Sequence, residues 1–509
     1  MNLSRIVKVV VTLLLAGSVL YIPYESLGVA LTPVEIRVIA MFVMAAFFWI
    51  LSPIPIWTTS VLVIVVSLVT LSNQCLPFLR YDEAGVVYPN LVNSKALMAT
   101  FADPVIMLFL GGFFLAAAAT KYHLDMNLAK VMLKPFGKNP RFVMLGIMMI
   151  TAIFSMFMSN TATAAMMVAI LAPVLALFDE DDKGRIAFAL AIPIAANVGG
   201  MGTPIGTPPN AIALKSLGDI GASVTFGKWM AFGIPYVIIL LLIAWAFLVF
   251  LFPIKKKSME LTIGGKFPRS PKAIIVYVTF VVTVILWVLG KGIVGIDENV
   301  VAMIPIAVFS VTQVITAADL KAMGWDVLWL VAGGFALGLE LQQTGLAKDL
   351  IDAIPFAEWS PLGLMIGVGV ICLFMANFMS HSATAALMVP IIAVVGVNLG
   401  SNLDSLGGSV ALLVSVAFAS SLGMSLPIST PPNAIAYNTG YVSTKGMAQS
   451  GIFIGIVGMV LTYVMMIFLA HINMFGSEKT EAEPAPVAAQ VATTEPAPAP
   501  AATVVAPAQ

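Results

Sequence analysis

The sequence has little charge and few residues with chemically reactive side chains. Only 10% of its 509 residues are charged, and it contains three histidines and two cysteines. A soluble domain has roughly 25% charged residues, so this chain has too few to cover a water-exposed surface. Its residues are 60% hydrophobic, which indicates that lipid is the surrounding solvent. A cytosolic enzyme, a nucleic-acid-binding protein and a disordered scaffold are therefore excluded.

An excess of charge of one sign is also lacking. The chain has 25 Lys and Arg residues against 25 Asp and Glu residues, which gives no reason to expect a polyanionic partner. Cys75 and Cys372 are too few for a disulfide framework or a zinc site. We expect both to be small core residues, and we expect no cofactor and no transition metal.

What is present is a series of apolar runs. A membrane-spanning helix needs about 20 mostly apolar residues. Nine uninterrupted runs have this character, near 6–23, 35–52, 54–72, 104–120, 229–253, 273–290, 299–316, 326–340 and 450–472. Four further segments are long but interrupted: 183–215 and 408–440 by Gly and Pro, and 141–178 and 361–398 by a polar centre. The pattern predicts an all-α polytopic membrane protein with about eleven transmembrane helices plus two re-entrant hairpins, at 141–178 and 361–398.

Basic residues predict the orientation, because short cytoplasmic loops are enriched in Lys and Arg. Basic clusters occur before the first run, between Lys121 and Arg141, and in the linker 254–272. All three lie in the cytoplasm if the N-terminus is cytoplasmic and each hairpin returns to its starting side. The C-terminus is then outside, and the expected location is a bacterial-type inner membrane. The tail 476–509 is rich in Ala and Pro and is expected to be disordered.

An internal repeat relates the segments 1–253 and 273–475. Three motifs recur in the same order at separations of 222, 221 and 223 residues: Gly111–Phe113 as Gly333–Phe335, Ser159–Met166 as Ser380–Leu387, and Thr207–Ile212 as Thr430–Ile435. Five predicted spans separate the two hairpins, and an odd number reverses direction. The repeat is therefore expected to have inverted topology, which is typical of secondary transporters. A duplicated helical bundle without transport would not explain polar, helix-breaking sequence at membrane depth.

The interrupted segments carry the chemistry. Lipid cannot hydrogen-bond a broken backbone, so such a break is tolerated only inside protein or beside a wet cavity. A helix that stops and restarts exposes carbonyl groups on one side, which suit Na⁺, and N–H groups on the other, which suit an anion. The loops at 199–210 and 423–433 cannot be continuous helix, because they are rich in Gly and Pro. The alternative interpretation is a pair of kinked packing helices with Thr and Asn as caps.

No Lys or Arg lies at any of the four breaks. The charge of a bound anion must then be offset by helix ends, hydroxyl groups and co-bound cations. This favours a mechanism in which sodium binds first and creates the positive field that the substrate needs.

With its doubled Ser-Asn-Thr-like hairpin tips and doubled Thr-Pro-Pro-Asn loops, the chain resembles the divalent anion:sodium symporters, a family of dicarboxylate, citrate and sulfate transporters. The resemblance covers residues 1–475. It implies a homodimer formed through scaffold helices, and a transport part that moves like an elevator. It also implies substrate contacts at Ser159, Asn160, Thr161, Thr207, Pro208, Ser380, His381, Ser382, Thr430 and Pro431. Sodium would be held by Ser155, Ser159, Asn160, Gly199 and Gly202 in the first half, and by Asn377, Ser380 and Gly423 in the second.

One departure from the family pattern matters. The second tip reads Ser380-His381-Ser382 in place of Ser-Asn-Thr. His381 could act as a neutral donor in place of Asn, could be protonated and attract the anion, or could replace the second sodium. The departure leaves the substrate and the number of coupled sodium ions open.

The expected function is sodium-coupled symport of a divalent anion. A C4 dicarboxylate such as succinate, malate or fumarate is favoured, because each of two separated tips could take one carboxylate. An electroneutral dicarboxylate exchanger and a sulfate symporter are the closest alternatives. A channel would need a continuous polar pore, which the sequence does not show. An intramembrane hydrolase is not expected, because no acidic residue adjoins His381 and no nucleophile elbow occurs. Glu340 is expected at the membrane edge rather than as a functional carboxylate.

Overall fold

The computed structural model describes residues 3–24, 31–175, 178–179, 181–222, 224–259, 268–353 and 359–475. Within these residues the regular elements are helices, and β pairing is limited to two isolated bridges, Ser72 with Val92 and Tyr81 with Val87. The predicted all-α fold class is confirmed. The tail 476–509 and residues 260–267 of the basic linker lie outside the described residues, so the expectations for them stay predictions.

Each uninterrupted apolar run forms one helix: α1 (Leu3–Val19), α2 (Pro33–Leu51), α3 (Ile56–Thr70), α6 (Pro104–Lys121), α12 (Phe226–Leu251), α13 (Pro271–Ile293), α14 (Glu298–Val311), α16 (Trp325–Gln343) and α22 (Thr444–His471). In the described part of the chain, eight helical stretches have the length and hydropathy to cross a bilayer. Helices α1, α3 and α14 are shorter, at 17, 15 and 14 residues. The count of about eleven spans stays a prediction.

All four polar motifs interrupt helices. The segment 141–178 is split into α8 (Pro140–Ser155) and α9 (Asn160–Leu175), and 361–398 into α18 (Pro361–Phe378) and α19 (His381–Leu399). The Gly/Pro loops separate α10 (Gly184–Gly199) and the 3₁₀ turn η4 (Gly200–Gly202) from α11 (Pro208–Asp219), and α20 (Gly408–Ser421) from α21 (Pro431–Asn438). Each resumed helix after a Gly/Pro loop begins with a Pro pair, because Pro fits the first turn, where its missing N–H is not needed.

Short helices connect these elements: α4 (Pro77–Arg80), α5 (Ser94–Ala99), η2 (Thr100–Ala102), α7 (Leu124–Leu133), η3 (Lys134–Phe136), α15 (Ala317–Lys321), α17 (Leu346–Ala353) and η6 (Gly400–Leu406).

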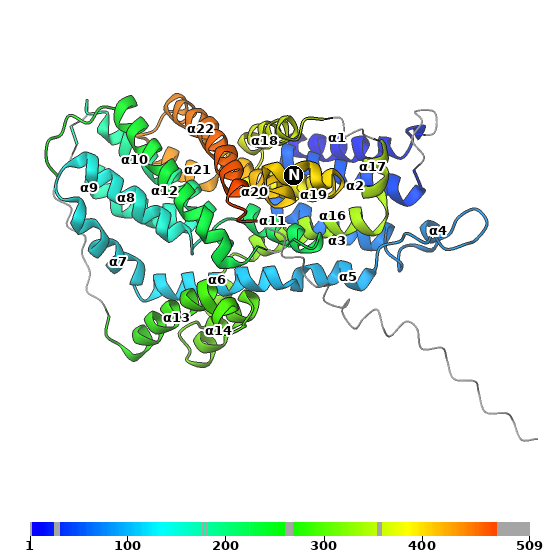
Figure 1. The fold of residues 1–509 in the computed structure, drawn as a ribbon, viewed down its shortest axis with the longest axis horizontal. Coiled ribbons are helices and arrows are strands. Elements are labelled where there is room, and N and C mark those ends of the chain that lie inside the picture. The colour runs from blue at the N-terminus through cyan, green and yellow to red at the C-terminus, as the bar shows by residue number, and fades with distance from the viewer. Residues whose placement is uncertain are drawn as a thin grey trace, which may run out of the picture.

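The two halves of the chain interlock instead of folding side by side. Helix α11 of the first half packs against α19 and α20 of the second, and α21 of the second half packs against α9 and α10 of the first. Helices α6 and α14, and likewise α3 and α16, also pair across the halves. Figure 1 shows this mixing of colours: orange α21 lies beside cyan α9 and α10, and green α13 and α14 lie under α6. The interlocking brings all four chain breaks toward one region of the molecule.

A polar contact joins α3 and α16 inside this apolar packing. Glu340 lies one turn before the end of α16 and is fully buried. Its expected place at the membrane edge stays a prediction. The Ser67 hydroxyl lies 2.5 Å from Glu340 Oε1 and 2.8 Å from the Val63 carbonyl oxygen. A hydroxyl group has one proton to donate. This proton is therefore shared between Glu340 Oε1 and the Val63 carbonyl oxygen.

We expect Ser67→Ala to lower the free energy of unfolding by about 1–3 kcal/mol, because it leaves the buried Glu340 carboxyl group without its partner. Ser67→Ala combined with Glu340→Met should recover most of this loss, because both polar groups are then gone. Thermal unfolding of the purified variants in detergent measures both effects. A double variant no more stable than the single variant would contradict this account.

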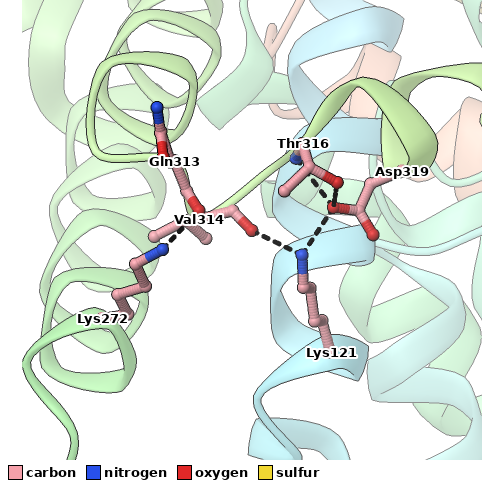
Figure 2. A network of polar contacts seen from close by, with 6 residues as sticks. All are labelled: Lys121, Lys272, Gln313, Val314, Thr316 and Asp319. Atoms are coloured by element: carbon pink, nitrogen blue, oxygen red, sulfur yellow. Dashed lines mark hydrogen bonds and ion pairs between the residues drawn. The ribbon is translucent and has the colours of Figure 1, made fainter.

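A second polar network lies where α6, α13 and the α14–α15 connection meet (Figure 2). Lys121 Nζ donates to Asp319 Oδ2 at 2.5 Å and to the Val314 carbonyl oxygen at 3.0 Å. The Thr316 backbone N–H and hydroxyl also donate to Asp319 Oδ2, each at 2.7 Å. Lys272 Nζ donates to the Gln313 carbonyl oxygen. Hydrogen bonds from Lys121 and Thr316 lower the pKa of Asp319 from its ordinary value of 3.8 to about 2.

The lowered pKa of Asp319 predicts a pH dependence of stability. The carboxylate contributes stability above about pH 4, and this contribution is lost as the pH falls toward 2. Lys121→Met should lower the unfolding free energy at pH 7 by about 0.2–1 kcal/mol, because the ion pair is partly exposed. It should also reduce the difference in melting temperature between pH 7 and pH 3. An equal pH dependence in the variant and the parent would count against the contact.

Candidate functional site

One cavity of about 350 Å³ lies where the four breaks meet, a size within the ordinary range for small-molecule sites. All ten residues predicted to contact substrate line it: Ser159, Asn160, Thr161, Thr207, Pro208, Ser380, His381, Ser382, Thr430 and Pro431. The structure therefore brings together two hairpin tips and two Gly/Pro loops that lie far apart in the sequence.

The resumed hairpin helices begin at this cavity. Ser159 Oγ accepts a hydrogen bond from the Ala162 backbone N–H at 3.2 Å, and Ser380 Oγ accepts one from Ala383 N–H at 3.1 Å. These serines cap the N-termini of α9 and α19. Other N–H groups of each first turn have no partner within the helix, so both tips present partial positive charge to the cavity.

Two asparagine side chains hold the broken loops in shape. Asn210 Nδ2 donates to the carbonyl oxygens of Gly200 and Thr203, at 3.1 and 2.8 Å. Asn433 Nδ2 donates to those of Met424 and Leu426, at 2.8 and 3.0 Å. Both asparagines are buried. Each therefore satisfies two carbonyl groups that the break removes from helical hydrogen bonding.

Asn197 is a lining residue that the sequence reasoning did not select. It is buried near the end of α10, and its Nδ2 donates to Thr430 Oγ1 at 3.2 Å and to Asn433 Oδ1 at 3.3 Å. It therefore ties α10 of the first half to α21 of the second. An amide within the apolar run that precedes Gly199-Gly200 is the signal that could have identified it.

Oxygen atoms gather behind the first hairpin tip. The end of the Asn160 side-chain amide lies 2.6 Å from Ser155 Oγ, and 3.2 Å from the carbonyl oxygens of both Ala196 and Gly206. Two arrangements satisfy this group: the amide nitrogen donates to the three oxygens, or the amide oxygen joins them around a cation. Ser155 is buried, and its hydroxyl also lies 2.7 Å from the Ala196 oxygen. The predicted residues Gly199 and Gly202 lie beside this cluster in the chain but do not line the cavity.

The second tip is built differently. His381 Nε2 lies 2.8 Å from the Gly423 carbonyl oxygen, and the imidazole is buried. Asn377 Oδ1 accepts from the Ser425 backbone N–H at 2.8 Å, and Asn377 Nδ2 donates to the Leu373 carbonyl oxygen. Two oxygens predicted to face a second sodium thus already have partners in the protein.

The cavity wall is mostly apolar and carries little charge. Asp326, at the start of α16, is the single charged residue among the described lining residues, and no Lys or Arg borders the cavity. A bound anion would thus be neutralised by helix N-termini, hydroxyl and amide donors, and cations. Among the described residues, no group of three His, Cys, Asp or Glu side chains could hold a metal ion.

Comparison with known proteins agrees with this geometry. The family model described as the sodium:sulfate symporter transmembrane region matches residues 3–475. The chain belongs to the sodium:sulfate symporter family. It is accordingly a multi-pass membrane transporter and not an enzyme, and sodium fits as its coupling ion.

Three relatives are similar over most of their length. An uncharacterized transporter of Haemophilus influenzae is 33% identical over 74% of this chain and 83% of that protein. A protein of Staphylococcus saprophyticus named sodium-dependent dicarboxylate transporter SdcS is 29% identical over 85% of each chain. The protein of that name from Staphylococcus aureus strain USA300 is 31% identical over 85% of this chain and 86% of the relative.

One solved structure shares the fold. The Alcanivorax borkumensis YdaH transporter superposes with a TM-score of 0.51, at 12% identity, over 82% of this chain and 98% of that chain. At this identity the likeness concerns the fold alone. It agrees with an all-α fold for this member of the sodium:sulfate symporter family.

Close backbone packing around the first loop gives a test. A Cβ atom at Gly206 would lie 2.4 Å from the Gly200 carbonyl oxygen, whereas a Cβ atom at Gly218 in α11 would meet nothing within 4 Å. Gly206→Ala should therefore lower the unfolding free energy by about 1–3 kcal/mol, since backbone must shift. The control Gly218→Ala should be neutral or stabilising by up to about 1 kcal/mol. Melting temperatures in detergent compare the two, and equal values would contradict the close contact.

Proposed function

We propose that this transporter is a sodium-coupled symporter of a divalent anion, and that its substrate is a C4 dicarboxylate such as succinate, malate or fumarate. The observation that carries the proposal is the placement of the oxygen cluster around Ser155 and Asn160 directly behind a helix N-terminus that lines the cavity. A cation in the cluster and an anion at the helix N-terminus would stabilise each other, which couples their binding.

The substrate would bridge the two tips. One carboxylate would accept hydrogen bonds at Ser159, Asn160 and Thr161, and the other at Ser380, Ser382 and the backbone N–H of His381. The Thr-Pro pairs at Thr207–Pro208 and Thr430–Pro431 would close the two remaining walls. Two separate donor-rich tips that line one cavity suit a dianion with separated charges better than compact sulfate. Relatives that are named sodium-dependent dicarboxylate transporters support the same substrate class.

Sodium would bind at the first tip before the anion. Ser155 Oγ, the Asn160 amide oxygen and the carbonyl oxygens of Ala196 and Gly206 form the ligand set that we assign. Unwound backbone carbonyls of this kind coordinate Na⁺ in secondary transporters. Since the described cavity wall has no basic side chain, the cation supplies charge that the anion requires.

The proposal includes the transporter's setting. It would lie in a bacterial-type inner membrane with its N-terminus cytoplasmic and its C-terminus outside, and its two hairpins would enter from opposite faces. It would form a homodimer through scaffold helices, with an elevator movement of the broken elements between the two sides.

Uptake of labelled succinate by proteoliposomes tests this function. An inward sodium gradient should drive accumulation, and its removal should abolish it. Ser155→Ala should weaken the apparent sodium affinity by roughly 5- to 100-fold, because about 1–3 kcal/mol of ligand interaction is lost. Ser450→Ala is the matched control, because that serine is equally buried but bonds only within α22, to Gly446 and Met447.

Two outcomes would refute the proposal. Uptake that ignores sodium but requires internal dicarboxylate would identify an exchanger. Sodium-driven uptake of sulfate, with no response to succinate, would overturn the substrate assignment.

A further inference from the structure

The internal repeat allows the two tips to be compared residue by residue. At the hairpin offset of 221 residues, Asn160 corresponds to His381 and Ser155 corresponds to Ala376. At the loop offset of 223 residues, Gly200 corresponds to Gly423, and Ala196 and Gly206 correspond to Ala419 and Ser429. Any difference between the tips can thus be traced to particular substitutions.

Both side-chain oxygens of the first cluster are missing from the second tip. Ala376 has no hydroxyl group to match Ser155, and it lies directly against the loop, since a Cβ atom at Gly423 would be 2.4 Å from the Ala376 Cβ. The imidazole of His381 replaces the amide oxygen of Asn160. A cation at the second tip would therefore have backbone carbonyl groups and no side-chain oxygen from these two positions.

The His381 imidazole also hydrogen-bonds the backbone carbonyl group of Gly423, which a cation at the second tip would need. His381 Nε2 lies 2.8 Å from the Gly423 carbonyl oxygen. In the first loop the equivalent Gly200 carbonyl oxygen accepts from Asn210 Nδ2, whereas Asn433 donates to Met424 and leaves Gly423 to the histidine. Asn377, the nearest alternative side-chain oxygen, accepts from Ser425 N–H. An imidazole N–H donor thus stands at the second tip, whereas the Asn160 amide at the first tip can present either its oxygen or its N–H group to the surrounding oxygens.

We infer that the histidine side chain stands in for a second sodium ion, so that the two tips together bind one sodium, at the first tip. This inference rests on the proposed symport function and deepens it. His381 is here a positioning residue: its N–H holds the Gly423 carbonyl group and with it the Thr430–Pro431 wall of the cavity. The sodium ligands Asn377, Ser380 and Gly423 expected from the family resemblance would then not form a cation site.

Restoring the lost oxygens should create the missing site. The double variant Ala376→Ser with His381→Asn gives the second tip the side chains of the first. Uptake by the wild type should depend hyperbolically on sodium concentration, and uptake by the double variant should depend on it sigmoidally. The double variant should also carry one more positive charge inward with each substrate. One sodium ion with a dicarboxylate dianion carries a net charge of −1, and two sodium ions with the dianion carry none. An inside-negative membrane potential, set with potassium and valinomycin, should therefore slow uptake by the wild type and leave uptake by the double variant nearly unchanged.

A binding measurement separates the inference from the proposed function. Sodium chloride alone, against equal choline chloride, should raise the melting temperature of purified wild-type protein in detergent. At the sodium concentration that half-saturates the wild type, Ser155→Ala should remove most of this shift, because it takes a ligand from the first tip and weakens sodium binding. Ala376→Ser with His381→Asn should enlarge it, and should restore part of it when combined with Ser155→Ala.

The outcomes are distinguishable. Sigmoidal sodium dependence in the wild type, or a sodium-induced shift that survives Ser155→Ala, would overturn the single-site inference and leave sodium-coupled symport standing. A folded double variant with unchanged sodium dependence and unchanged thermal shift would also overturn it. If the double variant does not fold, the single variant His381→Asn takes its place in both assays. Unchanged sodium dependence and an unchanged thermal shift in that variant would also count against the inference. Wild-type protein that responds to sodium in neither assay would refute the proposed function itself.

Discussion

Main chain that leaves a helix within apolar surroundings must have its carbonyl and amide groups satisfied by the protein itself. The fold meets this requirement at four breaks by placing them together and by filling them with polar side chains. Asn210 and Asn433 each bind two loop carbonyl groups, and serines cap the resumed hairpin helices. Because water is excluded from lipid, an unpaired backbone group there costs several kcal/mol. This cost explains why side-chain hydrogen bonds to backbone groups are so frequent around the cavity.

The same requirement produces a binding site. The N-termini of the resumed hairpin helices lie at a common cavity, and the carbonyl oxygens of Ala196 and Gly206 lie beside the Asn160 side-chain amide. Asn197 links that cavity's walls across the two halves. A ligand that binds there therefore contacts both halves at once. This arrangement gives a physical route by which an ion at one tip affects an anion held between the tips.

Near-identical motifs can have different roles once their side chains diverge. The backbone breaks occur at equivalent places in both repeats, yet Ser155 and Asn160 surround an oxygen cluster while Ala376 and His381 do not. The helix breaks depend on Gly, Pro and capping residues that both repeats keep. The sodium ligand set that we propose depends on two side chains, Ser155 and Asn160, that only one repeat keeps. The two repeats therefore share their helix breaks but differ in the side chains that could bind an ion.

The sequence alone determined the helical class, the ranges of the long apolar helices and the location of all four breaks, since these follow from local hydropathy and from Gly and Pro. It also identified ten of the lining residues, through a repeat and a family resemblance. It did not identify Asn197 or Asp326 as lining residues, and it did not show that Asn377 is already hydrogen-bonded. Only the tertiary structure showed these two lining positions and this hydrogen bond. It also showed that Glu340 is buried beside Ser67. Each depends on which residues from distant segments meet, and hydrogen-bond partners across interlocked halves leave no trace in local sequence.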